Sequence, residues 1–177
     1  MPWLWLFGAS GAGKSAAGFE LYRQLAAEGR RVGFVDLDQI GICLPDDDPV
    51  RGPIKAANLH SALRSFAEVG AEGVVVAGDV SGPPMQRILD LSAEAPPRTV
   101  RLRASAGEYE RRLRRRGAPA SVIARAKAHD TRFPRAGDID VDTEGRDVAE
   151  VARAIRCALP DWPRAKAPRT GRVEPLR

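Results

Sequence analysis

Residues 8–15 read Gly-Ala-Ser-Gly-Ala-Gly-Lys-Ser, which places two glycines, a lysine and a serine at the spacing G-x-x-x-x-G-K-[ST]. In such a loop the backbone N–H groups converge on an anion, and the following helix adds the positive end of its dipole. The ammonium of Lys14 is expected to reach the β- and γ-phosphates of a nucleotide, and the hydroxyl of Ser15 to bind Mg²⁺. The motif therefore predicts a phosphate-binding loop formed by Gly8, Ala9, Ser10, Gly11, Ala12, Gly13, Lys14 and Ser15.

The residues on either side of this loop have the context that the motif requires. Residues 3–7, Trp-Leu-Trp-Leu-Phe, are an apolar run typical of a buried strand, and Ala17, Leu21 and Leu25 recur at helical spacing after the loop. The alternative is a glycine-rich turn with a surface lysine. A strand before the loop and a helix after it favour the phosphate-binding interpretation.

Three aspartates follow two further predicted strands. Residues 31–36 are expected to form a short strand that ends in Asp36-Leu-Asp38, and the apolar run at 73–78 is followed by Asp79. Ligands collect at the carboxyl ends of strands in open α/β sheets, so these carboxylates are expected to meet a substrate or a metal ion. Asp79 has the place of a Walker B carboxylate, which holds Mg²⁺ directly or through water.

A helix is predicted from about Ile54 to Val69, and its first turns carry polar side chains. Lys55 and Asn58 are candidates for binding a substrate, and a solvated surface is the alternative for both. The segment 39–53 before this helix is predicted to be a loop, with an acidic proline-flanked turn at 45–49.

Basic residues are concentrated in one part of the chain. Between Arg98 and Arg135 there are twelve Lys or Arg against three acids, an excess larger than the net charge of +5 of the whole chain. Five of these arginines lie on a helix that begins at a capping box formed by Ser105 and Glu108. Because Leu113 is expected to face the core, helical spacing places Arg112 and Arg116 closer to the sheet than Arg114.

The five predicted strands alternate with helices, which implies one parallel sheet covered on both faces. Its strands are expected at 3–7, 31–36, 73–78, 99–103 and 139–142, and a short helix carrying Ile88 and Leu89 is expected after the third strand. Gly29 and Gly117 are expected to end the helices that precede them. Asp147 and Glu150 have the spacing of a cap for a last helix. With 177 residues, a single domain over 1–160 is predicted, followed by a basic, proline-rich tail at 161–177 with the composition of a disordered segment.

Composition favours a cytoplasmic protein. No apolar run approaches the length of a membrane span, and residues 3–7 are too short for a signal peptide and lack a basic segment before them. Cys43 and Cys157 have no metal-binding spacing and are expected to be free thiols in a reducing compartment. A monomer or a homodimer is compatible with these features.

Taken in order, these features resemble the superfamily of P-loop small-molecule kinases, which includes shikimate, gluconate and adenylylsulfate kinases, chloramphenicol phosphotransferase and nucleoside monophosphate kinases. The resemblance covers about residues 3–159. It rests on the loop at 8–15, on Asp36-Leu-Asp38, on the arginine-rich helix at 109–117 and on Asp142-Thr-Glu-Gly145. The loop motif is the one feature that is specific for this superfamily by itself. The order of all four features along the chain strengthens the resemblance.

The resemblance implies a three-layer P-loop fold with a five-stranded parallel sheet in the order 2-3-1-4-5 and an arginine-rich lid. It implies ATP and Mg²⁺ as cofactors and a small molecule as phosphoryl acceptor, through a hydroxyl or a phosphate group. The implied catalytic residues are Lys14, Asp38, Arg112 and Arg116, of which Asp38 accepts the proton of the acceptor and Arg112 also binds the nucleotide. The implied metal ligands are Ser15, Asp36 and Asp79, and the acceptor is expected near Asp38, Lys55 and Asn58.

Two other functions stay open at this point. A nucleotide switch such as a small GTPase is favoured by Asp79-Val-Ser-Gly82, which fits a D-x-x-G pattern, but residues 127–130 do not provide a guanine-reading N-K-x-D motif. A polynucleotide kinase is favoured by the arginines, although few aromatic residues accompany them for stacking on bases. A nucleic-acid partner is therefore not expected, and neither is a membrane partner.

Overall fold

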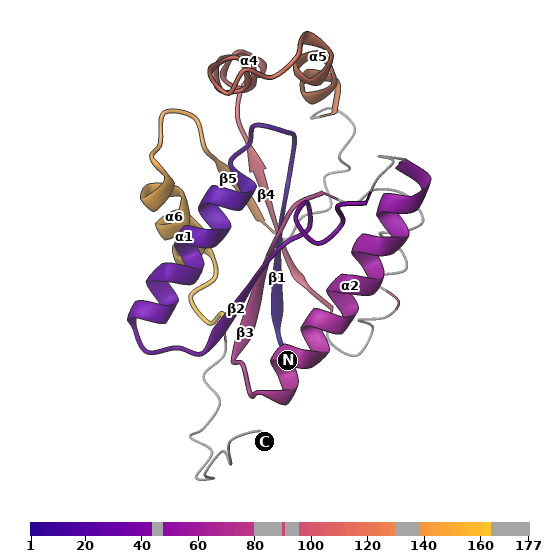
Figure 1. Cartoon of the computed structure of the whole chain (residues 1–177). Coiled ribbons are helices and arrows are strands. Elements are labelled where there is room, and N and C mark those ends of the chain that lie inside the picture. Colours follow the sequence, from indigo (N-terminus) through magenta and orange to yellow (C-terminus); the bar gives the residue numbers. More distant parts are fainter. Residues whose placement is uncertain (44–47, 80–89, 91–95, 130–138, 164–177) are drawn as a thin grey trace.

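The computed structural model describes residues 1–43, 48–79, 90, 96–129 and 139–163. Five parallel strands form one sheet in the order β2-β3-β1-β4-β5 (Figure 1), which confirms the order that the resemblance implies. The strands are β1 (Trp3–Phe7), β2 (Val32–Asp36), β3 (Gly73–Ala77), β4 (Arg98–Arg103) and β5 (Ile139–Asp142). The helices are α1 (Lys14–Ala27), α2 (Asp48–Glu68), α4 (Ala106–Arg115), α5 (Ala120–His129) and α6 (Val148–Ala158).

Helices cover both faces of the sheet. α1 and α6 lie on one face and α2 on the other, while α4 and α5 lie beyond the carboxyl ends of the strands (Figure 1). Alternate residues of β1 therefore point into two separate cores: Leu4 and Leu6 pack with α1 and α6, and Trp3, Trp5 and Phe7 pack with α2. All five residues of β1 are buried, because a central parallel strand has no solvent-facing side.

Glycines at the ends of helices have the backbone that the sequence predicts. Gly29 follows α1 with φ of 75° and Gly117 follows α4 with φ of 70°, the left-handed region that glycine adopts without a steric penalty. Inside α1, a Cβ on Gly18 would lie 3.0 Å from the ring of Phe34 and 3.3 Å from Leu6 Cδ1. Close packing of α1 on the sheet therefore explains this glycine.

Two caps also confirm sequence predictions. The Ser105 hydroxyl accepts a hydrogen bond from the Glu108 backbone N–H at the start of α4. At the start of α6, Asp147 and Glu150 form a complete capping box in which each side chain accepts from the other's backbone N–H.

One helix boundary differs from the prediction. α2 begins at Asp48, not near Ile54, so residues 48–53 are helical and not part of a loop. Proline fixes φ near the helical value and its missing N–H is not needed in a first turn, so Pro49 is compatible with a helix start. Pro53 lies further inside the helix, at a position that proline disfavours. The rest of the acidic turn, 45–47, and the predicted short helix containing Ile88 and Leu89 fall outside the described residues.

The end of the described chain packs against the domain. Trp162 contacts the core formed by α1 and α6, Pro163 is buried, and the Pro163 carbonyl accepts a hydrogen bond from Arg30. Packing contacts are thus present as far as Pro163, while the domain boundary at 160 stays a prediction. Cys43 and Cys157 are free thiols, as expected. No helix among the described residues is both long and apolar enough to span a bilayer.

Candidate active site

The loop at 8–15 links the central strand β1 to α1, and its shape depends on glycine. Gly8, Gly11 and Gly13 have φ of 140°, 88° and 91°, values that side chains rarely allow. A Cβ on Gly8 would lie 2.2 Å from the Leu102 carbonyl oxygen, so β4 also requires glycine there. Ala9 and Ala12 are fully buried, which explains why these two positions of the loop are small.

Lys14 lies at the first residue of α1, and its ammonium is directed back over the loop. Its Nζ donates to the carbonyl oxygens of Gly8 at 2.8 Å and of Ala9 at 3.0 Å. Burial lowers the pKa of Lys14, and the negative charges of Asp79, Asp38 and Asp36 oppose this shift. These three carboxylates therefore lie within electrostatic reach of the phosphate-binding lysine, at the carboxyl ends of β2 and β3.

Asp36 and Asp38 begin a turn that follows β2. The Leu37 N–H donates to the Ala77 carbonyl at 2.8 Å and continues the pairing with β3, while the Asp38 N–H donates to Asp36 Oδ1 at 2.9 Å. Asp36 is half-buried, whereas 56% of the Asp38 side chain is exposed. The turn therefore directs Asp38 outward, where a bound molecule can meet it.

Lys55 and Asn58 lie one turn apart on α2, and both contact this same turn. Lys55 Nζ lies 2.6 Å from Asp38 Oδ1, and Asn58 Nδ2 donates to the Ile40 carbonyl at 2.7 Å. The structure thus brings together the three residues that the sequence predicts near the acceptor. It also shows that the polar groups of Lys55 and Asn58 are bound to the protein itself.

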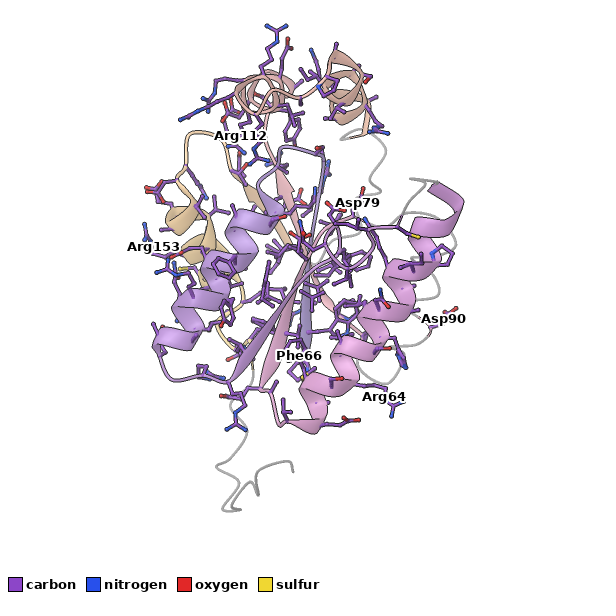
Figure 2. All side chains as sticks on the ribbon, viewed as in Figure 1. Arg64, Phe66, Asp79, Asp90, Arg112 and Arg153 are labelled. Carbon is purple, nitrogen blue, oxygen red and sulfur yellow. The ribbon has the colours of Figure 1, made fainter. Side chains whose placement is uncertain are left out.

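Asp79 follows β3 at the same end of the sheet as Arg112 of α4 (Figure 2). The strand end before it is fixed, because the Gly78 N–H donates to the Leu6 carbonyl and Trp5 Nε1 donates to the Gly78 carbonyl at 3.0 Å. Asp79 is half-buried and influences Lys14 electrostatically. Its position agrees with the Walker B role that the sequence predicts, which stays a prediction.

The predicted metal ligands are the hydroxyl of Ser15 and the carboxylates of Asp36 and Asp79. Within the described part of the chain, no three His, Cys, Asp or Glu side chains gather as a preformed metal cluster. Mg²⁺ in nucleotide sites is held by one or two carboxylates, phosphate oxygens and water, so it does not need such a cluster. An all-oxygen set close to the phosphate-binding lysine fits Mg²⁺.

Arg112 is the innermost arginine of α4, with 18% of its side chain exposed against 71% for Arg114. Its guanidinium donates to the Gly11 carbonyl at 3.3 Å, to Thr143 Oγ1 at 2.9 Å and to the Thr143 carbonyl at 2.6 Å. A fourth bond, of 2.7 Å, goes to Glu108. Arg112 therefore connects α4 both to the phosphate-binding loop and to the turn after β5.

Arg116 has a different environment. It is exposed and caps the end of α4 through its backbone N–H, which donates to the Arg112 and Leu113 carbonyls. Arg114 and Arg116 are both exposed, so the expectation that Arg116 lies closer to the sheet than Arg114 stays a prediction. A lid role for Arg112 and Arg116 stays a prediction.

Glu108 links two arginines. Its carboxylate accepts from Arg111 at 2.6 and 2.7 Å and from Arg112 at 2.7 Å. These bonds, with that from Arg111 the largest cause, lower the pKa of Glu108 to about 2. The sequence identified Glu108 only as a cap.

Sequence analysis did not predict two further contacts of the site, those of Thr143 with Arg112 and of Gly41 with Lys55. Thr143 is 2% exposed, and its partnership with Arg112 was not predicted; its place directly after a strand end, at Asp142, was the available signal. Gly41 contacts the stem of Lys55, and no motif marks that glycine.

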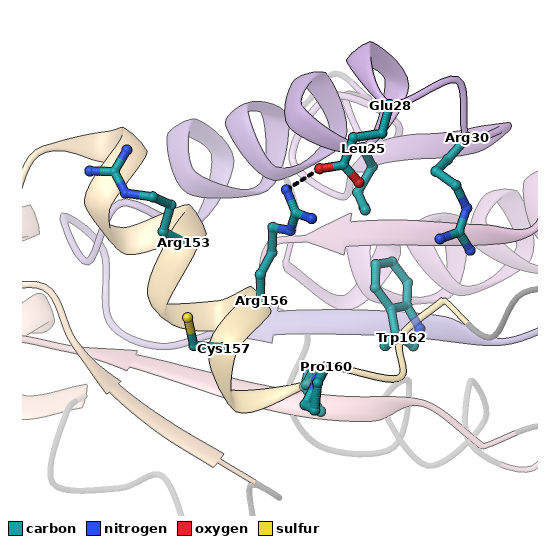
Figure 3. A pocket seen from close by; sticks show the side chains of 9 residues that line it. Leu25, Glu28, Arg30, Arg153, Arg156, Cys157, Pro160 and Trp162 are labelled. Atoms are coloured by element: carbon teal, nitrogen blue, oxygen red, sulfur yellow. Dashed lines mark ion pairs between the residues drawn. The ribbon is translucent and has the colours of Figure 1, made fainter.

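A pocket of about 360 Å³ lies at the other end of α1, away from the phosphate-binding loop (Figure 3). Apolar side chains line it together with three arginines, of which Arg156 is paired with Glu28 at 2.7 Å and Arg30 with Glu72 at 2.7 Å. The pocket contains none of the predicted catalytic residues. The candidate active site is therefore the cluster at the carboxyl ends of β1, β2 and β3.

No known protein-family model and no curated protein sequence matches the chain. Solved structures match over nearly its whole length. A gluconokinase from Sinorhizobium meliloti 1021 has 21% sequence identity and a TM-score of 0.66, and the match covers 90% of this chain and 91% of that one. A sugar kinase from Janibacter sp. HTCC2649 has 16% identity and a TM-score of 0.65, covering 92% and 96%.

The APS kinase of Mycobacterium tuberculosis, in complex with AMPPNP and APS, matches with 19% identity and a TM-score of 0.57 over 90% of this chain and 97% of that one. The chain has the P-loop kinase fold. This fold places the loop at 8–15 and the carboxylates after β2 and β3 at one edge of the sheet. It does not by itself identify a reaction.

Proposed function

We propose that the chain is an ATP- and Mg²⁺-dependent kinase that transfers the γ-phosphate to a small acceptor molecule. The observation that carries this proposal is the placement of an outward-facing carboxylate, Asp38, within electrostatic reach of the phosphate-binding Lys14. Phosphoryl transfer depends on positioning and charge neutralisation, and this pair supplies both. Neighbours with the same fold include kinases that act on sugars and on APS, which supports the same class of reaction.

The proposed step needs one proton acceptor and one leaving group. The hydroxyl oxygen of the acceptor forms a bond to the γ-phosphorus while its proton passes to the carboxylate of Asp38. The bond between the γ-phosphorus and the oxygen that bridges to the β-phosphate breaks, and ADP leaves with that electron pair. Lys14 turns from the Gly8 and Ala9 carbonyls toward the phosphates and stabilises their charge.

Ser15, Asp36 and Asp79 are the residues that would hold Mg²⁺. When bound, the ion supplies neutralisation of the phosphate charges. Asp36 also orients the turn, because it accepts the Asp38 N–H. Its second function is therefore to fix the backbone that carries the proton acceptor.

The phosphate-binding role is tested by Lys14→Ala, with Arg114→Ala as control because that arginine is 71% exposed. We expect ATP binding measured by calorimetry to be lost or reduced by about 100-fold in Lys14→Ala, since a charged hydrogen bond of several kcal/mol is removed. The control is expected to bind ATP as the unmodified protein does. An unchanged ATP affinity in Lys14→Ala would refute the proposal, and a strong preference for GTP over ATP would favour a nucleotide switch.

A further inference from the structure

Lys55 is the one lysine or arginine among the described residues that is buried, with 7% of its surface exposed. Its stem lies against the backbone of Gly41, where an added Cβ would be 2.3 Å from Lys55 Cγ and 2.9 Å from Cε. A larger residue at position 41 would therefore displace the lysine. The combination of a buried lysine and a glycine that makes room for it indicates a specific placement of the ammonium.

The ammonium of Lys55 lies behind Asp38. It is 2.6 Å from Asp38 Oδ1 and 3.4 Å from the Asp79 carbonyl oxygen, and 8% of the Lys55 side chain is exposed against 56% for Asp38. A buried cation is costly unless a counter-ion pairs with it, so this pair constrains both residues.

We propose that Lys55 is a positioning residue that holds Asp38 from its buried side, so that the open side of the carboxylate faces the acceptor. This inference rests on the proposed kinase function and adds a residue to its site. A carboxylate that is held on one side accepts a hydrogen bond from an acceptor hydroxyl on the other. The ammonium of Lys55 also reduces the repulsion between Asp38 and the phosphates of the nucleotide.

The pair itself is tested by NMR of the full chain with ¹⁵N-labelled lysine. A buried, hydrogen-bonded ammonium exchanges its protons slowly, so we expect a resolved Lys55 Nζ signal that is lost in Asp38→Asn. This readout does not depend on ATP or on an acceptor. A Lys55 signal that is unchanged by Asp38→Asn would overturn the proposal.

Its action through Asp38 is tested by a double-mutant cycle of Lys55→Met and Asp38→Asn. The readout is ADP release from Mg-ATP with water as acceptor. We expect Asp38→Asn to slow ADP release by about 100-fold or more and Lys55→Met by about tenfold, each with ATP affinity within about twofold of the unmodified protein. If Lys55 acts through Asp38, the double variant is no slower than Asp38→Asn alone. If the double variant slows ADP release by the product of the two single effects, Lys55 acts independently of Asp38 and the proposal is overturned.

Two further variants separate this effect from general damage to the fold. Gly41→Ala keeps both charges but crowds the stem of Lys55, so it is expected to slow ADP release as Lys55→Met does. Ser61→Ala, on an exposed position of α2, is the control and is expected to have no effect. ATP binding by calorimetry reports whether each variant is folded. Absence of ATP binding in the unmodified protein would refute the kinase function itself, independently of the NMR result.

Discussion

The two sides of the site each contain a cation paired with a carboxylate, but the pairs differ in what is exposed. On the side of α4, Arg112 and Glu108 have 18% and 11% of their side chains exposed, and the guanidinium is bound to three further acceptors. On the side of α2, Lys55 is covered while 56% of Asp38 is exposed. A pair bound on all sides holds elements together, whereas a pair with one open side can meet a ligand.

This difference in exposure indicates that the Arg112 pair and the Lys55 pair have different functions. Arg112 joins α4, the Gly11 carbonyl and Thr143, so it fixes the base of the phosphate-binding loop against the turn after β5. Asp38 is fixed through one oxygen and through its own backbone. Loss of the Arg112 contacts is therefore expected to disturb the whole nucleotide site. Loss of the Lys55 pair is expected to affect only the proton acceptor, Asp38.

Replacing Arg112 is expected to have the largest effect on stability. Arg112→Ala removes four hydrogen bonds and leaves the Thr143 hydroxyl bonded only to the Arg103 carbonyl, so we expect a loss of about 2 kcal/mol in the free energy of unfolding. ATP affinity should fall with it. Denaturant unfolding and calorimetry measure the two quantities.

Arg116→Ala is the matched control for that prediction, because Arg116 is exposed on the same helix. It is expected to leave unfolding unchanged, so a lower turnover at equal stability would identify Arg116 as an arginine that acts on the phosphates. If Arg112→Ala lowered turnover without changing stability or ATP affinity, Arg112 would be a catalytic lid residue and the contrast between the two regions would fail.

Acid is expected to weaken the α4 region by protonating Glu108. The folded protein lowers the pKa of Glu108 to about 2 from an ordinary value of 4.5, mainly through the bond from Arg111 and then through that from Arg112. A lowered pKa contributes stability that is fully present above the unfolded pKa and is lost as the pH falls. The loss therefore occurs between pH 4.5 and about 2.

Thermal unfolding as a function of pH measures this contribution. In Glu108→Gln the dependence of stability on pH between 4.5 and 2 should become shallower, because glutamine cannot be protonated in this range. Ser61→Ala serves as control, since Ser61 is exposed on α2 and its hydroxyl is bonded to the Ala57 carbonyl and not to a titrating group. An equally steep dependence in Glu108→Gln would show that other carboxylates cause the loss of stability.

Sequence analysis predicted the parts of the site that depend on neighbours along the chain. The loop at 8–15, its flanking strand and helix, and the caps at Ser105 and Asp147 are local patterns, and the structure confirms their conformation. The start of α2 was missed because Pro53 lies inside the helix, at a position that proline disfavours.

Contacts between distant residues were beyond the reach of these patterns. Lys55 pairs with Asp38 across 17 positions and Arg112 with Thr143 across 31, so both contacts depend on how the strands are ordered in the sheet. Spacing indicated that Lys55 and Arg112 were near the site. It did not indicate that the first is bound to the candidate proton acceptor, nor that the second is bound on all sides.

Asn58 is expected to show the smallest effect and to refine the contrast on the α2 side. Its Nδ2 donates to the Ile40 carbonyl at 2.7 Å, which holds the turn that carries Asp38, but Asn58 itself is exposed. Asn58→Ala should therefore cost about 0.5 to 1 kcal/mol in the free energy of unfolding.

Asn58→Ala should also lower the rate of ADP release by less than about threefold, because the turn keeps the hydrogen bond from the Asp38 N–H to Asp36 and the pair with Lys55. Denaturant unfolding and the ADP-release assay measure these changes. A loss of turnover as large as that of Lys55→Met would mean that the turn, and not the buried cation, sets the position of Asp38.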